Sequence, residues 1–494
     1  MLKKISGVVA FMGLCALSLL LLSCGSSSSR PSGVVYVLTQ GTSSQGTPGF
    51  GNNVSSFVID FNNGYLTLIN SNASACPPGN NVDTNPCGIP LNVVLDPLGA
   101  NAFVLDQGVP CVLLSTQMGA QCVSGSANPT PPSIYPYTVN SDGSLASPGT
   151  AITWTANSYP DTAIAMQRDP AGQFLFVIDQ GSSPSPGYPV PTPVTPQSCP
   201  HAPANQFDVC PSISVFAMPK PGSGSNTLTL ASGSPFYLSK IPTALSAITF
   251  TPPGASTVQE LLFVSNNFDI CSQNCTYPSP NNDNTLSVYG VSSSGVLTEQ
   301  QYSPYTIAAV DPLSVIAVYT NPPTENTGNL FVYVGNQDPN GGHLYPFQVC
   351  TVISAVCTQQ NVASNQMVPL ATCPQQSCDV PPTSVGQSPI GLVVDPTNSF
   401  LYVASEGSNQ VFGFLINTSA GKLTALTGSP QPSQGLQPIS IALHPSVNNT
   451  GQYLFVSNSN SQTVAGFSLN TVNGSMSSPT TTITPAAPSG MAAH

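Results

Sequence analysis

The sequence predicts an all-β fold, because one strand-rich module returns about seven times along the chain. Each copy has a proline, a short apolar run, a turn, and then an aromatic and valine-rich run that ends in a polar residue. The clearest copies begin at Pro389 and Pro438 and lead into Leu401-Tyr-Val403 and Leu454-Phe-Val456. These runs are rich in β-branched and aromatic residues and are too short for helices, so they predict strands.

The first strand of each module opens at a proline, which fixes φ and has no N–H to donate, and which therefore belongs at a strand end. The opening prolines are Pro90, Pro160, Pro242, Pro312, Pro389, Pro438 and Pro488. The second strand is apolar and the third alternates, as in Val411-Phe-Gly-Phe-Leu415. A tight turn then leads to a fourth strand that begins at Leu145, Leu297 or Leu423. Four antiparallel strands repeated around an axis predict a β-propeller.

The first unit and the last residues complement each other. The unit from Val34 to Leu68 lacks the opening proline strand, and Pro488–His494 resembles that strand with nothing after it. Pairing the two completes a seven-bladed propeller over residues 34–494, closed by the C-terminal strand, and removes an open sheet edge. The alternative is that residues 480–494 form a frayed tail.

The N-terminus is predicted to be a targeting segment. Lys3 and Lys4 precede an apolar stretch that ends at Leu21-Leu22-Ser23-Cys24. This pattern resembles the bacterial lipobox, in which the cysteine is lipidated after cleavage. We expect a lipoprotein signal peptide over residues 1–23, a lipidated Cys24 with a Ser-rich tether over 24–33, and attachment to a membrane of the bacterial cell envelope, facing the periplasm or the exterior. An ordinary signal peptide or an anchor helix is the alternative.

Charged residues make up only 5% of the chain, and the net charge is −12. Lys and Arg together number seven, and two of them lie in the leader. So few cations cannot form a basic patch, which excludes nucleic acid as a partner. A phosphorylated ligand is also disfavoured, because phosphate is normally held by Arg, Lys, a helix N-terminus or a metal.

The cysteines fit an exported protein. Of 14 cysteines, Cys15 lies in the leader and Cys24 at the lipid site, and the remaining even number favours disulfides. We expect local pairs: Cys76 with Cys87, Cys111 with Cys122, Cys199 with Cys210, Cys271 with Cys275, Cys350 with Cys357, and Cys373 with Cys378. Only Cys271 and Cys275 have a zinc-like spacing, and no second ligand pair accompanies them.

The long loops should share one face of the ring. Connections that follow second and fourth strands emerge together, and they hold nearly all of the extra length and all of the expected disulfides except Cys350–Cys357. Such loops on a rigid ring are typical of a recognition surface for a protein or a glycan. The alternative is that the disulfides only protect the loops outside the cell.

The same face should carry an acidic rim. Asp106, Asp179 and Glu406 lie near the ends of second strands, and Asp161 lies at the start of a first strand. No cofactor is required, but this rim could hold a divalent cation such as Ca²⁺ or Mg²⁺, or a polyhydroxyl ligand. The alternative is a set of solvated residues in local turns. No spacing selects a catalytic pair from them.

Several motifs resemble one family. Asp395-Pro396 followed by Leu401-Tyr-Val403, then Gly421-Lys-Leu-Thr424 and Gly428-Ser-Pro430, resemble the lactonase-type seven-bladed propellers, which include 6-phosphogluconolactonase-like and YVTN-repeat proteins. The resemblance implies the fold, and family members include sugar-lactone hydrolases and proteins of unassigned role. No catalytic set matches residue by residue, and the shortage of Arg and Lys departs from the needs of a phosphorylated lactone.

Two functions therefore stay open. One is a non-catalytic, lipid-anchored propeller that binds a protein or glycan through its loop face. The other is a hydrolase that opens a neutral lactone in the axial pocket, with a divalent metal held by the rim. Whether the chain is an enzyme is not decided by its sequence.

Overall fold

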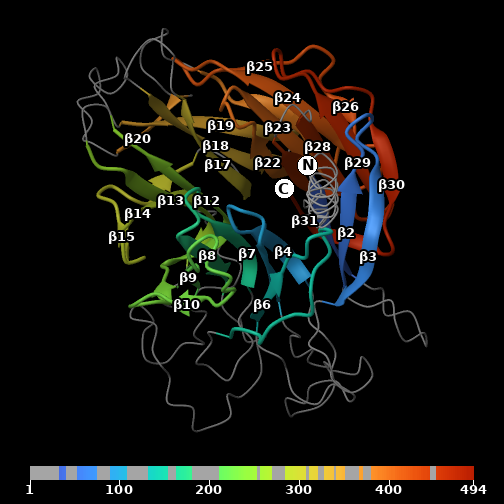
Figure 1. Cartoon of the computed structure of the whole chain (residues 1–494). Helices are drawn as coiled ribbons and strands as arrows, with labels where there is room; N and C mark the ends of the chain where they lie inside the picture. The colour runs from blue at the N-terminus through green and yellow to red at the C-terminus, as the bar shows by residue number, and fades with distance from the viewer. Residues whose placement is uncertain are drawn as a thin grey trace, which may run out of the picture.

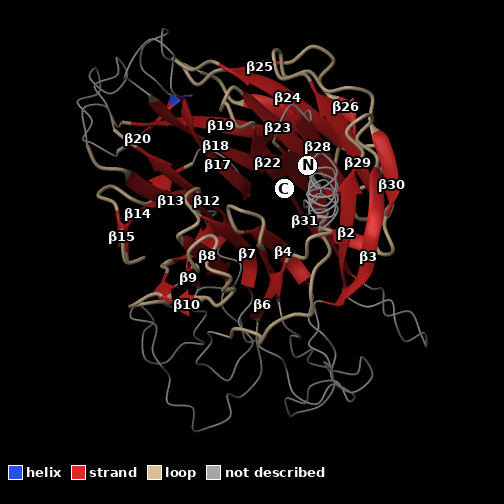
Figure 2. Ribbon diagram, viewed as in Figure 1, coloured by secondary structure: helices blue, strands red, loops and turns tan. Residues whose placement is uncertain are grey.

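The computed structural model describes residues 33–40, 53–74, 90–107, 132–153, 163–180, 211–252, 256–269, 284–307, 311–320, 328–338, 341–350, 366–370, 380–445 and 452–494. These residues form 31 strands in seven antiparallel sheets arranged around a common axis (Figures 1 and 2). The predicted seven-bladed, all-β propeller is confirmed. Within the described residues, no helix is long and apolar enough to cross a membrane.

The blades are numbered along the chain, and their strands are given from the axis outwards. Blade 1 contains β31 (Ala487–Ala493), β1 (Val34–Gln40), β2 (Asn53–Ile59) and β3 (Leu66–Ser74). Blade 2 contains β4 (Pro90–Leu95), β5 (Asn101–Asp106) and β6 (Ser133–Thr138). Blade 3 contains β7 (Ala163–Arg168), β8 (Phe174–Asp179), β9 (Ser212–Ala217), β10 (Thr229–Leu230) and β11 (Phe236–Tyr237). Blade 4 contains β12 (Lys240–Phe250), β13 (Gln259–Asp269), β14 (Thr285–Val291), β15 (Leu297–Glu299) and β16 (Tyr305–Thr306).

The remaining blades follow the same plan. Blade 5 contains β17 (Pro312–Thr320), β18 (Asn329–Asp338), β19 (Gly341–Val349), β20 (Met367–Pro369) and β21 (Thr383–Gly386). Blade 6 contains β22 (Pro389–Val394), β23 (Phe400–Ser405), β24 (Gln410–Ile416), β25 (Leu423–Ala425) and β26 (Gln431–Pro432). Blade 7 contains β27 (Pro438–His444), β28 (Gln452–Asn458), β29 (Thr463–Leu469) and β30 (Thr480–Ile483).

The C-terminal strand closes the ring. β31 pairs antiparallel with β1, with Met491 opposite Val37. The backbones of Val34 and His494 exchange two hydrogen bonds of 2.9 Å at the end of this pair. β31 also contacts β27 and β4, so the seven innermost strands contact one another in an unbroken circle. The predicted closure is confirmed, and residues 487–493 are a strand rather than a frayed tail.

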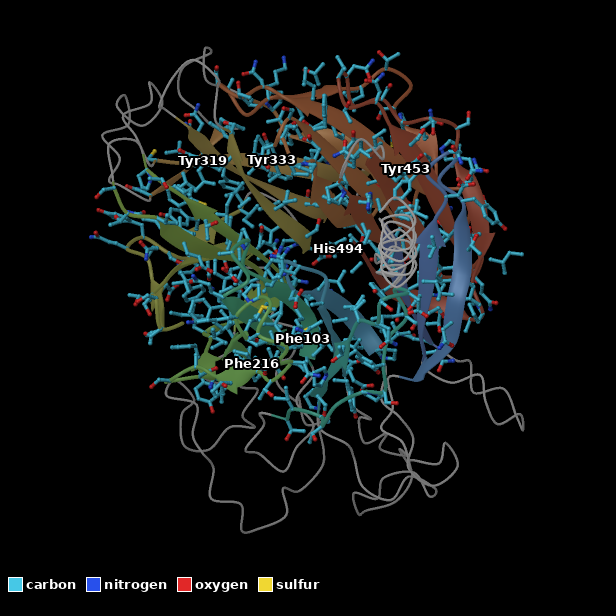
Figure 3. The ribbon with its side chains drawn as sticks, in the orientation of Figure 1. Phe103, Phe216, Tyr319, Tyr333, Tyr453 and His494 are labelled. Atoms are coloured by element: carbon cyan, nitrogen blue, oxygen red, sulfur yellow. The ribbon has the colours of Figure 1, made fainter. Side chains whose placement is uncertain are left out.

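The hydrophobic core is divided among the contacts between neighbouring blades, which we call seams. The seven apolar clusters each combine residues from two adjacent blades. Large aromatic side chains such as Phe103 and Tyr333 are fully buried in these clusters (Figure 3). Successive side chains of a second strand point alternately into the two seams that flank its blade. Nearly every residue of these strands is therefore buried, which explains their continuous apolar runs.

A tyrosine recurs at one position of the second strand, three residues before Thr39, Asn336 and Ser405. Its Oη donates to the carbonyl of a turn glycine in the next blade: Tyr36 to Gly143 at 2.9 Å, Tyr333 to Gly421 at 2.8 Å, and Tyr402 to Gly474 at 2.7 Å. The other four blades have phenylalanine at this position, namely Phe103, Phe176, Phe263 and Phe455. The position therefore fills each seam with an aromatic ring, and in three blades it also joins the seam by a hydrogen bond.

Two local expectations were inaccurate. Blade 2 has three strands among the described residues, and Leu145 forms only an isolated bridge with Val139 instead of starting a strand. In blade 3 the residue opposite Asp179 is Ala163, so Pro160 does not hold the position of the other opening prolines and lies outside the described residues. The innermost strand pairs on one side only, so proline is tolerated there but not required.

Candidate ligand site at the mouth of the ring

One face of the ring gathers the starts of first strands and the ends of second strands. In six blades the opening proline of the first strand, and in blade 3 Ala163, pairs with a polar residue near the end of the second strand; we call this proline or alanine the opening residue. These residues, which we call the buried ring, are Thr39, Asp106, Asp179, Asn266, Asn336, Ser405 and Asn458, and each is at most 3% exposed. Along each second strand, side chains at every other position share one face of the sheet, and the buried-ring residue is on the face that packs on the preceding blade.

The residue after each member of the buried ring is also polar and reaches solvent. This set, which we call the mouth ring, is Gln40, Gln107, Gln180, Asn267, Gln337, Glu406 and Ser459. Six of the seven are uncharged, and Glu406 is the single carboxylate. The mouth ring therefore places amide and hydroxyl groups, which both donate and accept hydrogen bonds, on this face of the ring.

A β-bulge marks the start of every innermost strand. One extra residue follows the opening residue in all seven blades, so the register with the second strand shifts there. The bulged residues, which we call the collar, are Leu91, Ile164, Thr243, Leu313, Ile390, Ile439 and Ser489, and all are half-buried. Five of the seven are aliphatic, so the innermost strands offer apolar surface next to the polar mouth ring.

Side chains from the preceding blade hold the collar in place. The carbonyls of three opening prolines accept hydrogen bonds across a seam: Pro90 from Ser489 at 2.5 Å, Pro242 from Gln180 at 3.0 Å, and Pro389 from Ser314 at 2.6 Å. Since these strands pair with a neighbour on one side only, their free carbonyls need such partners. The mouth of the ring is thereby fixed in shape before any ligand arrives.

The residues that lead into three first strands have a strained backbone. Asp311, Ser388 and Gln437 each precede an opening proline and have φ of 49°, 53° and 57°. Left-handed conformations of this kind cost non-glycine residues about 1–3 kcal/mol and cluster at functional sites. Ser388 also donates from Oγ to Oε1 of Gln337 at 3.2 Å, which connects its turn to the mouth ring of the preceding blade.

Residues 350–492 match the family model described as lactonase, 7-bladed beta-propeller. This part of the chain is similar to the seven-bladed propellers of the lactonase family, and it includes blades 6 and 7 and the closing strand as far as Ala492. Two solved structures have a similar fold over nearly the whole ring. The periplasmic gluconolactonase PpgL of Pseudomonas aeruginosa is 15% identical, with a TM-score of 0.50, and the match covers 92% of this chain and 98% of that one. A 6-phosphogluconolactonase candidate from Bacteroides uniformis is 12% identical, with a TM-score of 0.53 and coverages of 94% and 99%.

The comparison with curated protein sequences found no match. At identities this low the two structures show that the fold is shared and do not assign an activity.

Two of the predicted rim residues belong to the buried ring of the lactonase-type propeller. Asp106 and Asp179 lie at equivalent positions on the expected face, but their side chains are only 3% and 2% exposed. Burial and the charge of Asp106 raise the pKa of Tyr135 to about 12. The charge of Asp106 therefore acts on a side chain of its own blade. Glu406 belongs to the mouth ring and is half-buried, and Asp161 lies outside the described residues.

The described residues include only part of the expected metal and disulfide sites. No three His, Cys, Asp or Glu side chains among the described residues lie close enough together to hold a metal ion. Of the twelve cysteines expected to pair, only Cys350 is described; it is buried and disulfide-bonded. Its partner lies outside the described residues, so all six pairings stay predictions.

The long connections expected to form the loop face also lie mainly outside the described residues, but their attachment points are clear. The strand ends that they join pair with each other at the mouth: Asp106 with Ser133, and Asp179 with Ser212. The opposite face carries the tight turns, where Asp395 accepts hydrogen bonds from the backbones of Ser399 and Phe400. Asp395 therefore caps its turn.

The mouth ring is not among the sites predicted from the sequence. Its signal was present as a polar pair after each second strand, for example Asp106-Gln107, Asp179-Gln180 and Asn336-Gln337. The carboxylates predicted from the sequence divide between the rings, with Asp106 and Asp179 in the buried ring and Glu406 in the mouth ring. Chemically, the mouth is suited to hydrogen bonding with neutral hydroxyl groups, and Glu406 is its one group able to take up a proton.

Proposed function

We propose that this protein is a lipid-anchored propeller of the cell envelope that binds an uncharged, polyhydroxylated glycan at its mouth without converting it. The observation that supports this most is the mouth ring, in which six of seven polar side chains are neutral amides or hydroxyls. Each amide can donate to one sugar hydroxyl and accept from another.

The collar adds the second requirement of a sugar site. Its aliphatic members Leu91, Ile164, Leu313, Ile390 and Ile439 lie beside the polar ring on the innermost strands. Ligand sites commonly combine apolar lining with a few fixed polar groups. The C–H face of a sugar ring would pack on the collar while its hydroxyls meet the amides. The strained turns and seam hydrogen bonds preorganise this arrangement, which lowers the entropy that binding costs.

A glycan array that carries neutral, sulfated and sialylated saccharides tests the proposal. We expect the purified protein to bind neutral saccharides only, and titration calorimetry with a bound neutral saccharide should show at least about tenfold weaker binding for Gln337→Ala, since about 1.4 kcal/mol is one decade. Gln337 is exposed, so its loss should not unfold the protein. The matched control is Gln173→Ala, an exposed glutamine in the turn between β7 and β8 on the opposite face. Equal affinities of the two variants would exclude the mouth ring.

A protein ligand held by the disulfide-bearing loops is the other outcome of the array experiment. In that case no saccharide binds, and Gln337→Ala behaves as the unmodified protein. Reduction of the disulfides would then abolish binding of the protein ligand, whereas a glycan site built from the described strands should survive mild reduction.

The family match supports a second candidate, a hydrolase for a neutral lactone. Glu406 would act as the general base for water, and neighbouring amide N–H groups would stabilise the oxyanion. Acid release from glucono-δ-lactone, with and without a chelator, tests this candidate. Turnover that Glu406→Gln reduces by a factor of about 10² or more would establish it; turnover equal to the spontaneous rate would remove it.

Anchoring is tested separately. Lipidation at Cys24 predicts a mature N-terminus at this residue with attached acyl chains, visible by mass spectrometry, and release of Cys24→Ser from the membrane fraction. Peptide mapping under non-reducing conditions tests the six predicted cysteine pairs. These tests do not depend on the ligand.

A further inference from the structure

Two carboxyl groups outside the mouth lie at the seam between blades 3 and 4, where the charge of Asp169 acts on Glu260. Asp169 lies in the turn between β7 and β8, and Glu260 is the second residue of β13. Glu260 has the same strand parity as Leu262 and Val264, which pack on the side chains of β8. It therefore points toward blade 3. Asp169 is fully buried and Glu260 is half-buried.

Each of these carboxyl groups has one buried oxygen that receives no hydrogen bond in the structure, Oδ2 of Asp169 and Oε1 of Glu260. A buried oxygen without a donor costs about 1–3 kcal/mol. Two such oxygens on the same seam satisfy each other if one of them carries a proton, because a protonated carboxyl group donates to a carboxylate.

Equivalent turns show why Asp169 lacks a donor. In blade 2, Oδ2 of Asp96 accepts from Asn101 at 2.8 Å, and in blade 6, Oδ2 of Asp395 accepts from the backbone N–H and Oγ of Thr397. In blade 3 the residues at the positions of Asn101 and Thr397 are Phe174 and Ala171, which have no side-chain donor. In the turn of Asp169, the backbone N–H of Phe174 donates to Oδ1 at 2.7 Å, but no side chain at these two positions can donate to Oδ2.

The position of Glu260 points to the missing donor. It lies six residues before Asn266 of the buried ring. In blade 3, the residue six positions before Asp179 is Gln173, and this blade follows that of Asp96. In blade 7, the residue six positions before Asn458 is Gln452, and this blade follows that of Asp395. A protonated glutamic acid has the shape of glutamine and, like glutamine, can donate a hydrogen bond. Glu260 thus takes the place of a neutral residue.

We propose that Asp169 and Glu260 hold one proton between them at neutral pH, and that loss of this proton in alkaline solution weakens the seam between blades 3 and 4. The proton resides on Glu260 and is donated to Asp169; on deprotonation it passes to solvent, leaving two facing carboxylates. The device makes the stability of the ring pH-dependent through one seam out of seven.

The surrounding charges agree with this distribution. Arg168 donates to the carbonyls of Asp169 and Pro170 at 3.0 and 3.1 Å, and its charge lies near Asp169 and Asp96, so it favours the anionic form of Asp169. Tyr289 lies on the same side of blade 4, and its charged neighbour is Glu299. Burial, followed by the charge of Asp169, raises the pKa of Glu260 to about 8.

The sign of the pH dependence follows from linkage. The folded protein holds its proton on Glu260 up to about pH 8, whereas the unfolded chain releases it near the ordinary value of 4.5. Between these values the folded state binds more protons, so the contribution to stability is complete below 4.5, declines through this window, and is lost above about pH 8.

Thermal unfolding of the full mature protein at intervals from about pH 5 to about pH 9 tests the proposal. We expect the midpoint of the unmodified protein to fall across this range and that of Glu260→Gln to fall distinctly less, with the variant the more stable of the two at the alkaline end. The control is Glu299→Gln, an exposed carboxylate in the same blade, which should retain the decline. Identical pH profiles for Glu260→Gln and Glu299→Gln would overturn the proposal.

Infrared spectroscopy gives a second readout that does not depend on unfolding. The unmodified protein and Glu299→Gln should show the carbonyl band of a protonated carboxyl group at neutral pH, and the band should disappear in alkaline solution. Its absence at neutral pH, or its persistence in a folded Glu260→Gln variant, would refute the shared proton even if the variant proved unstable.

Discussion

The hydrogen bond between Tyr402 and Gly474 allows a direct test of how the seams are stabilised. Tyr402 is fully buried, and its Oη donates to the Gly474 carbonyl of the next blade at 2.7 Å. Burial raises the pKa of Tyr402, so the hydroxyl keeps its proton and remains a donor in alkaline solution. The change Tyr402→Phe removes the donor and retains the ring.

The expected loss is about 1–3 kcal/mol, because a buried carbonyl is left without a partner while little packing changes. Phenylalanine fits this position, since it stands there in four other blades. Urea unfolding followed by circular dichroism should show a lower midpoint with an unchanged slope. The control is Tyr65→Phe, which removes a hydroxyl from a side chain that is 47% exposed and should shift stability by no more than about 0.5 kcal/mol. If Tyr402→Phe costs no more than this control, the seam hydrogen bond contributes nothing and the reasoning fails.

Three further predictions concern the same framework. Gly474→Ala should lower the urea midpoint more than a surface Gly→Ala change, because Gly474 has φ of +70° and a Cβ would lie 2.4 Å from Phe400 Cδ1. Met491→Ala should cost about 2–5 kcal/mol and increase proteolysis in native conditions, because Met491 is 8% exposed in the closing strand. Asp395→Ala should destabilise blade 6, since its carboxylate accepts from Ser399, Phe400 and Thr397; an equal midpoint for this variant and the unmodified protein would contradict the capping role.

The strands and the closure could be predicted from sequence because their signals are local. Runs such as Leu401-Tyr-Val403 are apolar at every position since both sides of a second strand face a seam. Pro488 marked the closing strand in the same way as the other opening prolines. Pro160 was misleading, because the register is set by pairing with Asp179 and not by proline itself.

The candidate site was only partly predictable. Strand order alone predicts the face of the ring on which Asp106 and Asp179 lie and their equivalent positions at the ends of second strands. Whether a side chain at a strand end faces the channel or a neighbouring blade depends on the register and on the bulge after the opening residue, and period-two alternation does not reveal either. The lack of a hydrogen-bond donor to Asp169 Oδ2 depends on residues of two neighbouring blades. It therefore cannot be predicted from the sequence of a single blade.

Joining the first strand to the last has a consequence for how this ring forms. Six sheets are each contiguous in the chain, whereas the sheet of β1 needs β31, which is made after all the others. Until β31 is synthesised, the edge of β1 that it will cover has no partner strand and could pair with another chain. A chain that ends before Ala487 would leave the inner edge of β1 without a partner strand. Incomplete chains of this protein should therefore be recognised at this one unpaired edge.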